Sequence, residues 1–267
     1  MMTDETDRID ALDFLRGLAV MGILLANITI FALPQIAFLN PFAIGMTGPA
    51  DTAAWLLNLL LIDGKMRALF AMLLGASILL VMERAELAGR DGSAANRRRL
   101  LWLIPIGMAH FVLLWSGDIL VSLGIAGLIA LRFVRLEPFV LVKWALALLA
   151  LQWLIDLAWI LPDFWMRGAA LTPGASAQAV AFWQHHAAAL GISVGSGGGG
   201  AVQGDLTLFR SGYGAIVAAR LAEGALALRN IVLFALPELL AFIALGMAML
   251  KGGFLVGHWS RAEYRAI

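Results

Sequence analysis

Long apolar stretches recur along this chain, and they constrain its fold more than any other feature does. A helix needs about 20 apolar residues, each rising about 1.5 Å, to cross the roughly 30 Å hydrocarbon layer of a bilayer. The candidate spans are 12–33, 66–83, 100–116, 118–134, 138–160 and 231–250. With 61% hydrophobic and 14% charged residues, the chain has more apolar surface than a soluble core of 267 residues can bury. The sequence therefore predicts an all-α, polytopic bundle of about six transmembrane helices in a lipid bilayer.

The segments between the expected spans divide the chain into three parts. Residues 1–161 form an N-terminal transmembrane bundle, 162–229 form a long extracytoplasmic loop, and 230–267 hold the last span and a cytoplasmic tail. Basic residues beside the spans favour this arrangement, with the N-terminus in the cytoplasm, because cytoplasmic segments carry an excess of Lys and Arg. The three arginines at 97–99 are its strongest anchor.

Two regions are expected to depart from simple spans. Residues 53–62 precede a polar cluster at 63–67, and the whole apolar stretch is too long for one upright helix, so 53–62 should lie along the membrane or re-enter it. In the loop, the glycine-rich segment 191–206 predicts a flexible spacer. Its flanks, 176–190 and 213–230, are typical of amphipathic helices.

Composition excludes several classes of function. The net charge of +1 gives no basic field for nucleic acid, and zero cysteines exclude disulfides, thiolate metal sites and cysteine nucleophiles. His185 and His186 are adjacent, so on a helix their side chains point about 100° apart, and no acidic residue lies near them in the sequence. No metal site is expected.

Polar side chains inside the apolar stretches are the informative residues, since a charge at the bilayer centre costs about 3 kcal/mol or more. In the first span, Arg16 and Asn27 share one helix face, and Asp13 precedes Arg16 by one turn. An interfacial salt bridge between Asp13 and Arg16, and a hydrogen bond from Asn27 to another helix, would account for these residues. A polar seam that serves a substrate is the functional alternative.

The third expected span carries His110 close to the membrane midplane, about ten residues from the start of the helix. A histidine at this depth fits three roles: a hydrogen-bonded structural ring, a general base or a proton relay. Asp118 follows at the turn to the next span, where it is either a helix N-cap or part of a site with His110.

Four segments together carry a resemblance to a known family. They are "RIDALDFLRGLAVMGILLANI", "DGKMRALFAMLLGASILL", "RRRLLWLIPIGMAHFVLLWSGDILVSLGIAGLI" and "FALPELLAFIALGMAMLKGGFLVGHWS". They resemble the YeiB-like bacterial membrane proteins. That family is similar to the wider group of transmembrane acyltransferases, which includes the O-antigen and peptidoglycan acyltransferases and the lysosomal heparan acetyltransferase. The resemblance implies a multi-pass protein of the bacterial inner membrane that moves an acyl group from cytosolic acyl-CoA to a hydroxyl or amine.

The resemblance also implies roles for the polar residues. His110 would take the proton of the acceptor, Asn27 would donate to the oxyanion, and Asp118 would complete the catalytic set. The expected substrate-binding residues are Asp13, Arg16, Lys65, Arg67, Arg97, Arg98 and Arg99. The arginines at 16 and 97–99 would hold the CoA phosphates, and Lys65 and Arg67 would bind an anionic acceptor or pair with Asp118. Acyl-CoA would be a co-substrate, and no permanently bound cofactor is implied.

Two features depart from the family pattern. The sugar O-acyltransferases carry a histidine where this chain has Asn27, at the same spacing from Arg16, so the base must lie elsewhere and His110 is the membrane-embedded candidate. The chain also finishes at "EYRAI", where the family continues with further helices, so a C-terminal part is expected to be missing.

Two other classes of function remain open. A small-molecule or proton-coupled transporter would use His110 as its proton carrier and "LLIDGKMRALF" as a broken helix. A noncatalytic membrane protein is the third class.

Overall fold

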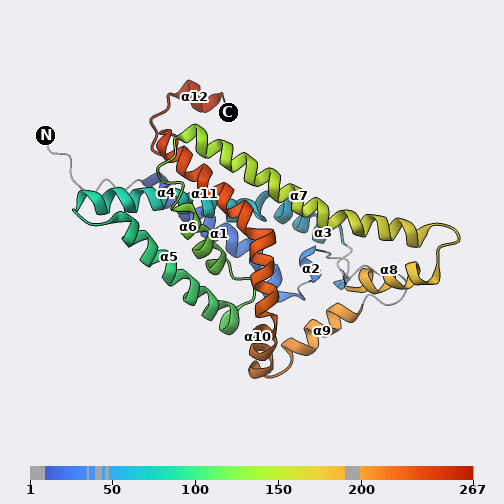
Figure 1. The fold of residues 1–267 in the computed structure, drawn as a ribbon. Helices are drawn as coiled ribbons and strands as arrows, with labels where there is room; N and C mark the ends of the chain where they lie inside the picture. The colour runs from blue at the N-terminus through green and yellow to red at the C-terminus, as the bar shows by residue number, and fades with distance from the viewer. Residues whose placement is uncertain (1–9, 35, 40–43, 46–47, 190–198, 267) are drawn as a thin grey trace. The chain divides into compact units, whose positions relative to one another are not determined.

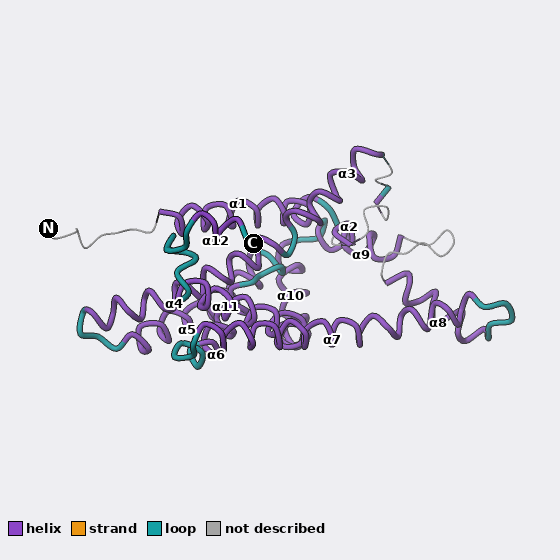
Figure 2. The backbone as a smooth tube through the Cα atoms, turned by 90° about the horizontal axis from the view of Figure 1, so that it is seen from above, coloured by secondary structure: helices purple, strands orange, loops and turns teal. Residues whose placement is uncertain are grey.

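The computed structural model describes residues 10–34, 36–39, 44–45, 48–189 and 199–266. These residues are almost entirely helical and contain no β-strand (Figures 1 and 2). The predicted all-α fold is confirmed.

Four helical stretches in the described part of the chain are long and apolar enough to cross a membrane. They are Leu12–Ala32, Pro49–Leu87, Pro138–Leu171 and Leu226–Lys251. They identify a polytopic membrane bundle, as predicted, with fewer long apolar helices than the six expected. The difference lies in the expected hairpin at 100–134. Its first helix, α5 (Gly92–Ala109), begins with polar residues and three arginines, and its second, α6 (Leu120–Ala130), has only 11 residues.

The helices form two compact units. The first contains the described residues up to Gly22, those of 65–152 and those from Leu226 onward. Its helices are the first part of α1 (Asp10–Ala32), α4 (Lys65–Leu87), α5, α6, the first part of α7 (Pro138–Leu171), α11 (Leu236–Lys251) and α12 (Arg261–Arg265). The second unit contains 23–64 and 153–225.

The first unit is built around the contact of α4 with α11, which lie side by side (Figure 1). Its core is apolar and fully buried: Ile78, Leu100, Leu123, Leu141, Leu239, Ile243 and Met247. Gly75 on α4 faces the backbone of Ile243, and Gly246 on α11 faces the backbone of Met72. A methyl group at either glycine would overlap that backbone, so the two glycines allow the close approach of the helices.

Polar contacts fix the ends of helices in the first unit. Asp91 precedes α5, and its side chain accepts hydrogen bonds from two amides of the first turn, including that of Ser93 at 2.8 Å. Lys251 ends α11 and donates from Nζ to the carbonyls of Val134 and Leu136, both at 2.7 Å. These carbonyls follow α6, so Lys251 ties the end of α11 to the turn before α7.

The second unit consists of shorter helices. They are the last part of α1, α2 (Ile36–Leu39), α3 (Pro49–Leu57), the π-helical turn η2 (Asn58–Ile62), the last part of α7, α8 (Ala177–Ala189), α9 (Gly199–Phe209) and most of α10 (Tyr213–Asn230). The helices α8 and α10 coincide with the amphipathic helices predicted in the loop. The predicted break in the apolar stretch is confirmed at Asp63, which is extended, and at Gly64, whose φ of 71° favours glycine.

Two boundaries predicted from the sequence are wrong. The fifth span was expected to end at 160, but α7 continues to Leu171 through Pro162. Proline usually disrupts a helix interior, yet the residues after it include good helix formers such as Met166 and Ala169, which allow the helix to resume. The expected glycine-rich spacer also overlaps α9, which is helical from Gly199. The part of the spacer at 191–198 lies outside the described residues.

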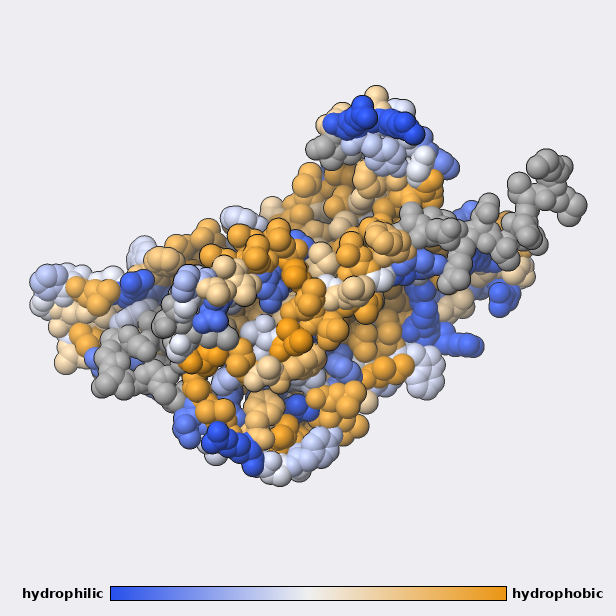
Figure 3. Space-filling model, turned by 180° about the vertical axis from the view of Figure 1, so that it is seen from behind, coloured by the Kyte–Doolittle hydropathy of each residue, from blue (hydrophilic) through white to orange (hydrophobic). Residues whose placement is uncertain are grey.

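Large apolar side chains cover much of the surface. Figure 3 shows hydrophobic residues over much of the visible surface, with hydrophilic residues among them. Among the exposed side chains are Phe14 and Leu24 on α1, and Trp153, Trp159 and Phe164 on α7. Such extensive exposed apolar surface is unfavourable in water and favourable against lipid, as the sequence predicted.

Candidate functional site

The first helix carries the predicted ion pair. Arg16 donates from Nη1 to Asp13 Oδ1 at 2.9 Å, and both side chains are more than a third exposed. Residues three positions apart lie on one side of a helix, so this contact follows from the sequence. Because exposed ion pairs contribute about 0–1 kcal/mol, the pair orients Arg16 more than it stabilises the fold.

A second guanidinium group, that of Arg99 on α5, contacts α4. Arg99 donates from Nη1 to Ser77 Oγ on α4 at 3.0 Å. Its Nη2 is shielded from solvent and makes no hydrogen bond to the described residues. Burial, and secondly the positive charge of Arg16, lower the pKa of Arg99 from its ordinary value. Arg16 is therefore an electrostatic neighbour of Arg99, although the two lie on different helices.

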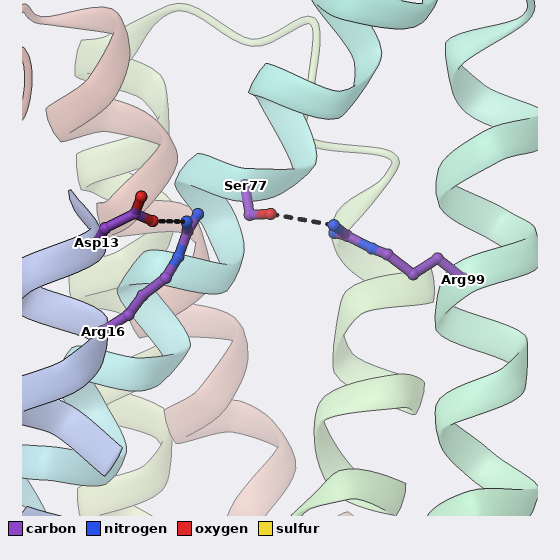
Figure 4. Close-up of polar contacts among 4 residues, drawn as sticks. All are labelled: Asp13, Arg16, Ser77 and Arg99. Atoms are coloured by element: carbon purple, nitrogen blue, oxygen red, sulfur yellow. Dashed lines mark hydrogen bonds and ion pairs between the residues drawn. The ribbon is translucent and has the colours of Figure 1, made fainter. Parts of the chain in front are cut away.

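Figure 4 shows how these side chains converge. Arg16 on α1 and Arg99 on α5 reach toward α4 from opposite sides, and Ser77 lies between their guanidinium groups. We call Arg16, Ser77 and Arg99 the arginine cluster. Arg97 and Arg98, which the sequence grouped with Arg99, are exposed and lie outside this cluster.

Asn96 holds the backbone on which the arginine cluster depends. Its side chain is fully buried and donates from Nδ2 to the carbonyl of Ile78 at 2.9 Å and to that of Gly92 at 3.3 Å. Asn96 lies one turn before Arg99 on α5, and Ile78 directly follows Ser77 on α4. The bond between the two helices therefore sets the position of Arg99 beside Ser77.

His110 and Asp118 form a second polar contact, at the junction of α5 and α6. His110 Nδ1 lies 3.1 Å from Asp118 Oδ1, with the aspartate 2% exposed and the histidine 33% exposed. The angles are outside hydrogen-bond geometry, so the contact is electrostatic. The other oxygen, Oδ2, accepts the amide of Val121 in the first turn of α6 at 3.0 Å. Asp118 thus caps the helix, as predicted, and also contacts His110.

The local backbone explains why His110 and Asp118 meet. His110 begins a π-helical turn, η3 (His110–Leu114), after which Trp115 is extended and the chain reverses toward α6. A methyl group at Gly107 would lie 2.6 Å from the amide nitrogen of Val121 and 2.9 Å from Asp118 Oδ2. The absence of a side chain at Gly107 therefore lets the start of α6 approach α5.

This arrangement suits a histidine that exchanges protons. A carboxylate at Nδ1 favours a proton on that nitrogen, which leaves Nε2 to accept one from another group. The contact therefore places a buried carboxylate beside the Nδ1 atom of His110.

Other predicted site residues lie elsewhere. Arg67 on α4 pairs with Glu238 on α11 at 2.9 Å, so the expectation that it pairs with Asp118 is wrong. Lys65 is the first residue of α4. Asn27 is partly buried on α1 and belongs to the second unit, whereas His110 belongs to the first, so their separation is not determined.

The second unit holds a further histidine contact. His186 Nε2 on α8 lies 2.8 Å from Asp163 Oδ1 on α7, although no acidic residue is close to His186 in the sequence. Phe182 stacks against the His186 ring at 6.4 Å between centroids. In the described part of the chain, no three His, Asp or Glu side chains gather as a metal site would require.

The sequence is similar to those of other bacterial proteins. "Uncharacterized protein YeiB" of Escherichia coli strain K12 is 32% identical over 259 residues, which is 95% of this chain and 58% of that protein. Almost the whole of this chain is therefore similar to a part of YeiB. "Uncharacterized protein YxaH" of Bacillus subtilis strain 168 is 36% identical over 146 residues, which cover 53% of this chain and 36% of YxaH. No family model and no solved structure matches the chain.

These matches support the resemblance to the YeiB-like proteins. The chain spans 58% of the length of YeiB, and its match covers 36% of YxaH. Both proteins are described as uncharacterized, so their names state no activity. The function of the chain must therefore be argued from its own residues.

The sequence did not indicate three residues that make key contacts in the structure: Ser77, Asn96 and Glu238. Ser77 and Asn96 are small or uncharged polar residues within helices, and no motif marks the face on which they lie. Glu238 did carry a signal, because an acidic residue inside the expected span 231–250 requires a partner.

Proposed function

We propose that the chain is a membrane acyltransferase, which moves an acyl group from cytosolic acyl-CoA to a hydroxyl or amine. The observation that carries the proposal is the contact of His110 with the buried carboxylate of Asp118. A histidine beside a buried carboxylate is a suitable candidate for a general base, and no cysteine nucleophile is present in the sequence. The similarity of the YeiB-like proteins to transmembrane acyltransferases supports the same reaction class.

The reaction would have two steps: the acceptor attacks the thioester, and the CoA thiolate then leaves. The acceptor oxygen or nitrogen attacks the thioester carbonyl while His110 Nε2 takes its proton, and a new bond forms to the acyl carbon. The carbon–sulfur bond then breaks, and the CoA thiolate takes the proton back from His110. Asp118, the carboxylate beside Nδ1, would stabilise the imidazolium ion between these steps.

The chain is proposed to lie in the bacterial inner membrane with its N-terminus on the cytoplasmic side. Arg97 and Arg98 then face the cytoplasm, where they would attract the phosphates of CoA. Lys65 lies at the opposite end of its span and is proposed to bind an anionic acceptor. Arg67, which pairs with Glu238, is proposed for the same role.

One observation favours a transporter as the second candidate. The apolar stretch 49–87 is broken at Asp63 and Gly64, where the chain leaves its helical conformation. Transporters often build substrate and ion sites from such interrupted helices. In that case His110 would carry a proton across the membrane and no thioester would be consumed.

Turnover by the purified chain in liposomes tests the proposal. We expect acetyl-CoA and a bacterial envelope extract, supplied together, to release free CoA thiol. The His110→Ala variant should lower that rate by about a hundredfold or more, because general-base catalysis typically contributes at least this much. His185→Ala, which removes an exposed histidine, is the matched control and should leave the rate unchanged.

Equal thiol release by wild type and His110→Ala would contradict the acyltransferase. Proton flux across the liposome membrane without thiol release, abolished in His110→Ala, would favour the transporter instead.

A further inference from the structure

The arginine cluster has more hydrogen-bond capacity than its protein partners use. Each guanidinium group carries five N–H donors. Arg16 donates one of them to Asp13, and Arg99 donates one to Ser77. Arg99 Nη2 is shielded from solvent without a hydrogen bond to the described residues. Leaving a buried charged donor unsatisfied is unfavourable, so an acceptor at this place would be bound strongly.

The charges at the cluster favour an anion. Two guanidinium groups approach one another here, and the carboxylate of Asp13 offsets one of their two positive charges. The repulsion between Arg16 and Arg99 is relieved if a negative group lies between them. A tetrahedral anion with several acceptor oxygens can accept from both forks and from the Ser77 hydroxyl at once.

The site is held in place before any ligand binds. Asn96 joins α5 to α4 directly beside Ser77, and Asp13 orients Arg16 from its own helix. Ordering flexible side chains on binding reduces affinity, so such preorganised arginines bind more tightly than mobile ones. The exposed neighbours Arg97 and Arg98 lack comparable contacts and would act through long-range attraction.

We propose that Arg16, Ser77 and Arg99 form a binding site for one phosphate group of a phosphate ester. The ester comes either from a soluble cofactor such as CoA or from the headgroup of an anionic phospholipid, since the same recognition chemistry serves both. A soluble source would deepen the proposed acyl transfer by locating the acyl donor, and this part alone rests on that function. The phosphate site itself stands on the cluster and does not require turnover.

Thermal unfolding of the detergent-purified full chain tests the site, because a ligand that binds the folded state raises its stability. One pair of probes is CoA against pantetheine, which lacks phosphate. The other is dioctanoyl phosphatidic acid against dioctanoylglycerol, which also lacks phosphate. Inorganic phosphate is compared with chloride at equal ionic strength. We expect at least one phosphate ester to raise the unfolding midpoint, and its phosphate-free counterpart to have no effect.

Variants connect that effect to the cluster. Arg99→Gln should weaken binding of the active probe roughly ten- to a hundredfold, the usual effect of losing charge-assisted hydrogen bonds. Arg90→Gln, an exposed arginine in the turn before α5, is the matched control and should bind as wild type does. If Arg99→Gln does not fold, Arg16→Gln replaces it, since the more exposed Arg16 tolerates substitution better.

The outcomes distinguish a soluble phosphate ester from a lipid headgroup, and they test the phosphate site separately from the proposed acyl transfer. A response to CoA alone supports the soluble ester, and a response to phosphatidic acid alone supports the lipid headgroup. A chain that binds CoA but releases no thiol would contradict the acyltransferase and retain the phosphate site. Equal binding by wild type and the arginine variants, or no response to any phosphate ester, would overturn the site.

Discussion

Single polar residues at the helix contacts determine where the candidate site lies. The sequence was sufficient for the ion pair of Asp13 with Arg16, because residues three apart on a helix meet by its geometry alone. A cap was one of the two roles predicted for Asp118, since aspartate before an apolar helix favours that role, and the structure shows the capping contact. The sequence left the contact of His110 with Asp118 open, because that contact depends on the π-helical turn and on Gly107.

A substitution at Asn96 tests whether a single buried side chain joins α4 to α5. Replacing it with Ala removes a buried donor and leaves the Ile78 carbonyl with one partner fewer, so the free energy of unfolding should fall by about 1–3 kcal/mol. Denaturant unfolding of the purified chain measures the change. Asn230→Ala, at an exposed asparagine, is the control. Equal stability of the two variants would show that Asn96 does not join α4 to α5.

Helix packing explains which elements could be foreseen. Hydropathy predicts the helices because the bilayer requires them, and the polar cluster at 63–67 indicated the break before α4. The length of α7 and the helicity of α9 were missed, since proline and glycine are only statistical signals of an ending. Which helices pair was also beyond the sequence, because Glu238 and Gly246 show no partner until α11 lies against α4.

The α4–α11 contact makes a prediction for its two glycines. Gly75→Ala or Gly246→Ala places a methyl group against the backbone of the other helix, so the helices must move apart. We expect each variant to lose about 1–3 kcal/mol of stability, as overpacked cores do. Gly17→Ala on α1 has open space around the new methyl, and its higher helix propensity should make it neutral or slightly stabilising. The midpoints of thermal unfolding of the three variants measure this difference. A lower midpoint for Gly17→Ala than for the other two variants would refute this account of the contact.

The whole molecule is proposed to cross the membrane with its N-terminus inside. The chain lacks cysteine, so single cysteines can report sidedness without background labelling. Ser211→Cys, exposed between α9 and α10, should react with an impermeant maleimide in intact cells. Ala88→Cys, exposed in the turn between α4 and α5, should react only after the membrane is permeabilised. The reverse pattern would exclude the proposed orientation and move the arginines at 97–99 to the outer side.

The central claim is that His110 and Asp118 act together as the base of an acyl transfer. A double-mutant cycle on the rate of CoA thiol release tests it most directly, with Asp118→Asn chosen because the amide oxygen can still cap α6. If Asp118 acts only through His110, the double variant should be no slower than His110→Ala alone, because residues that form one unit are not additive. A double variant slowed by the product of the two single effects would show independent roles and contradict the account.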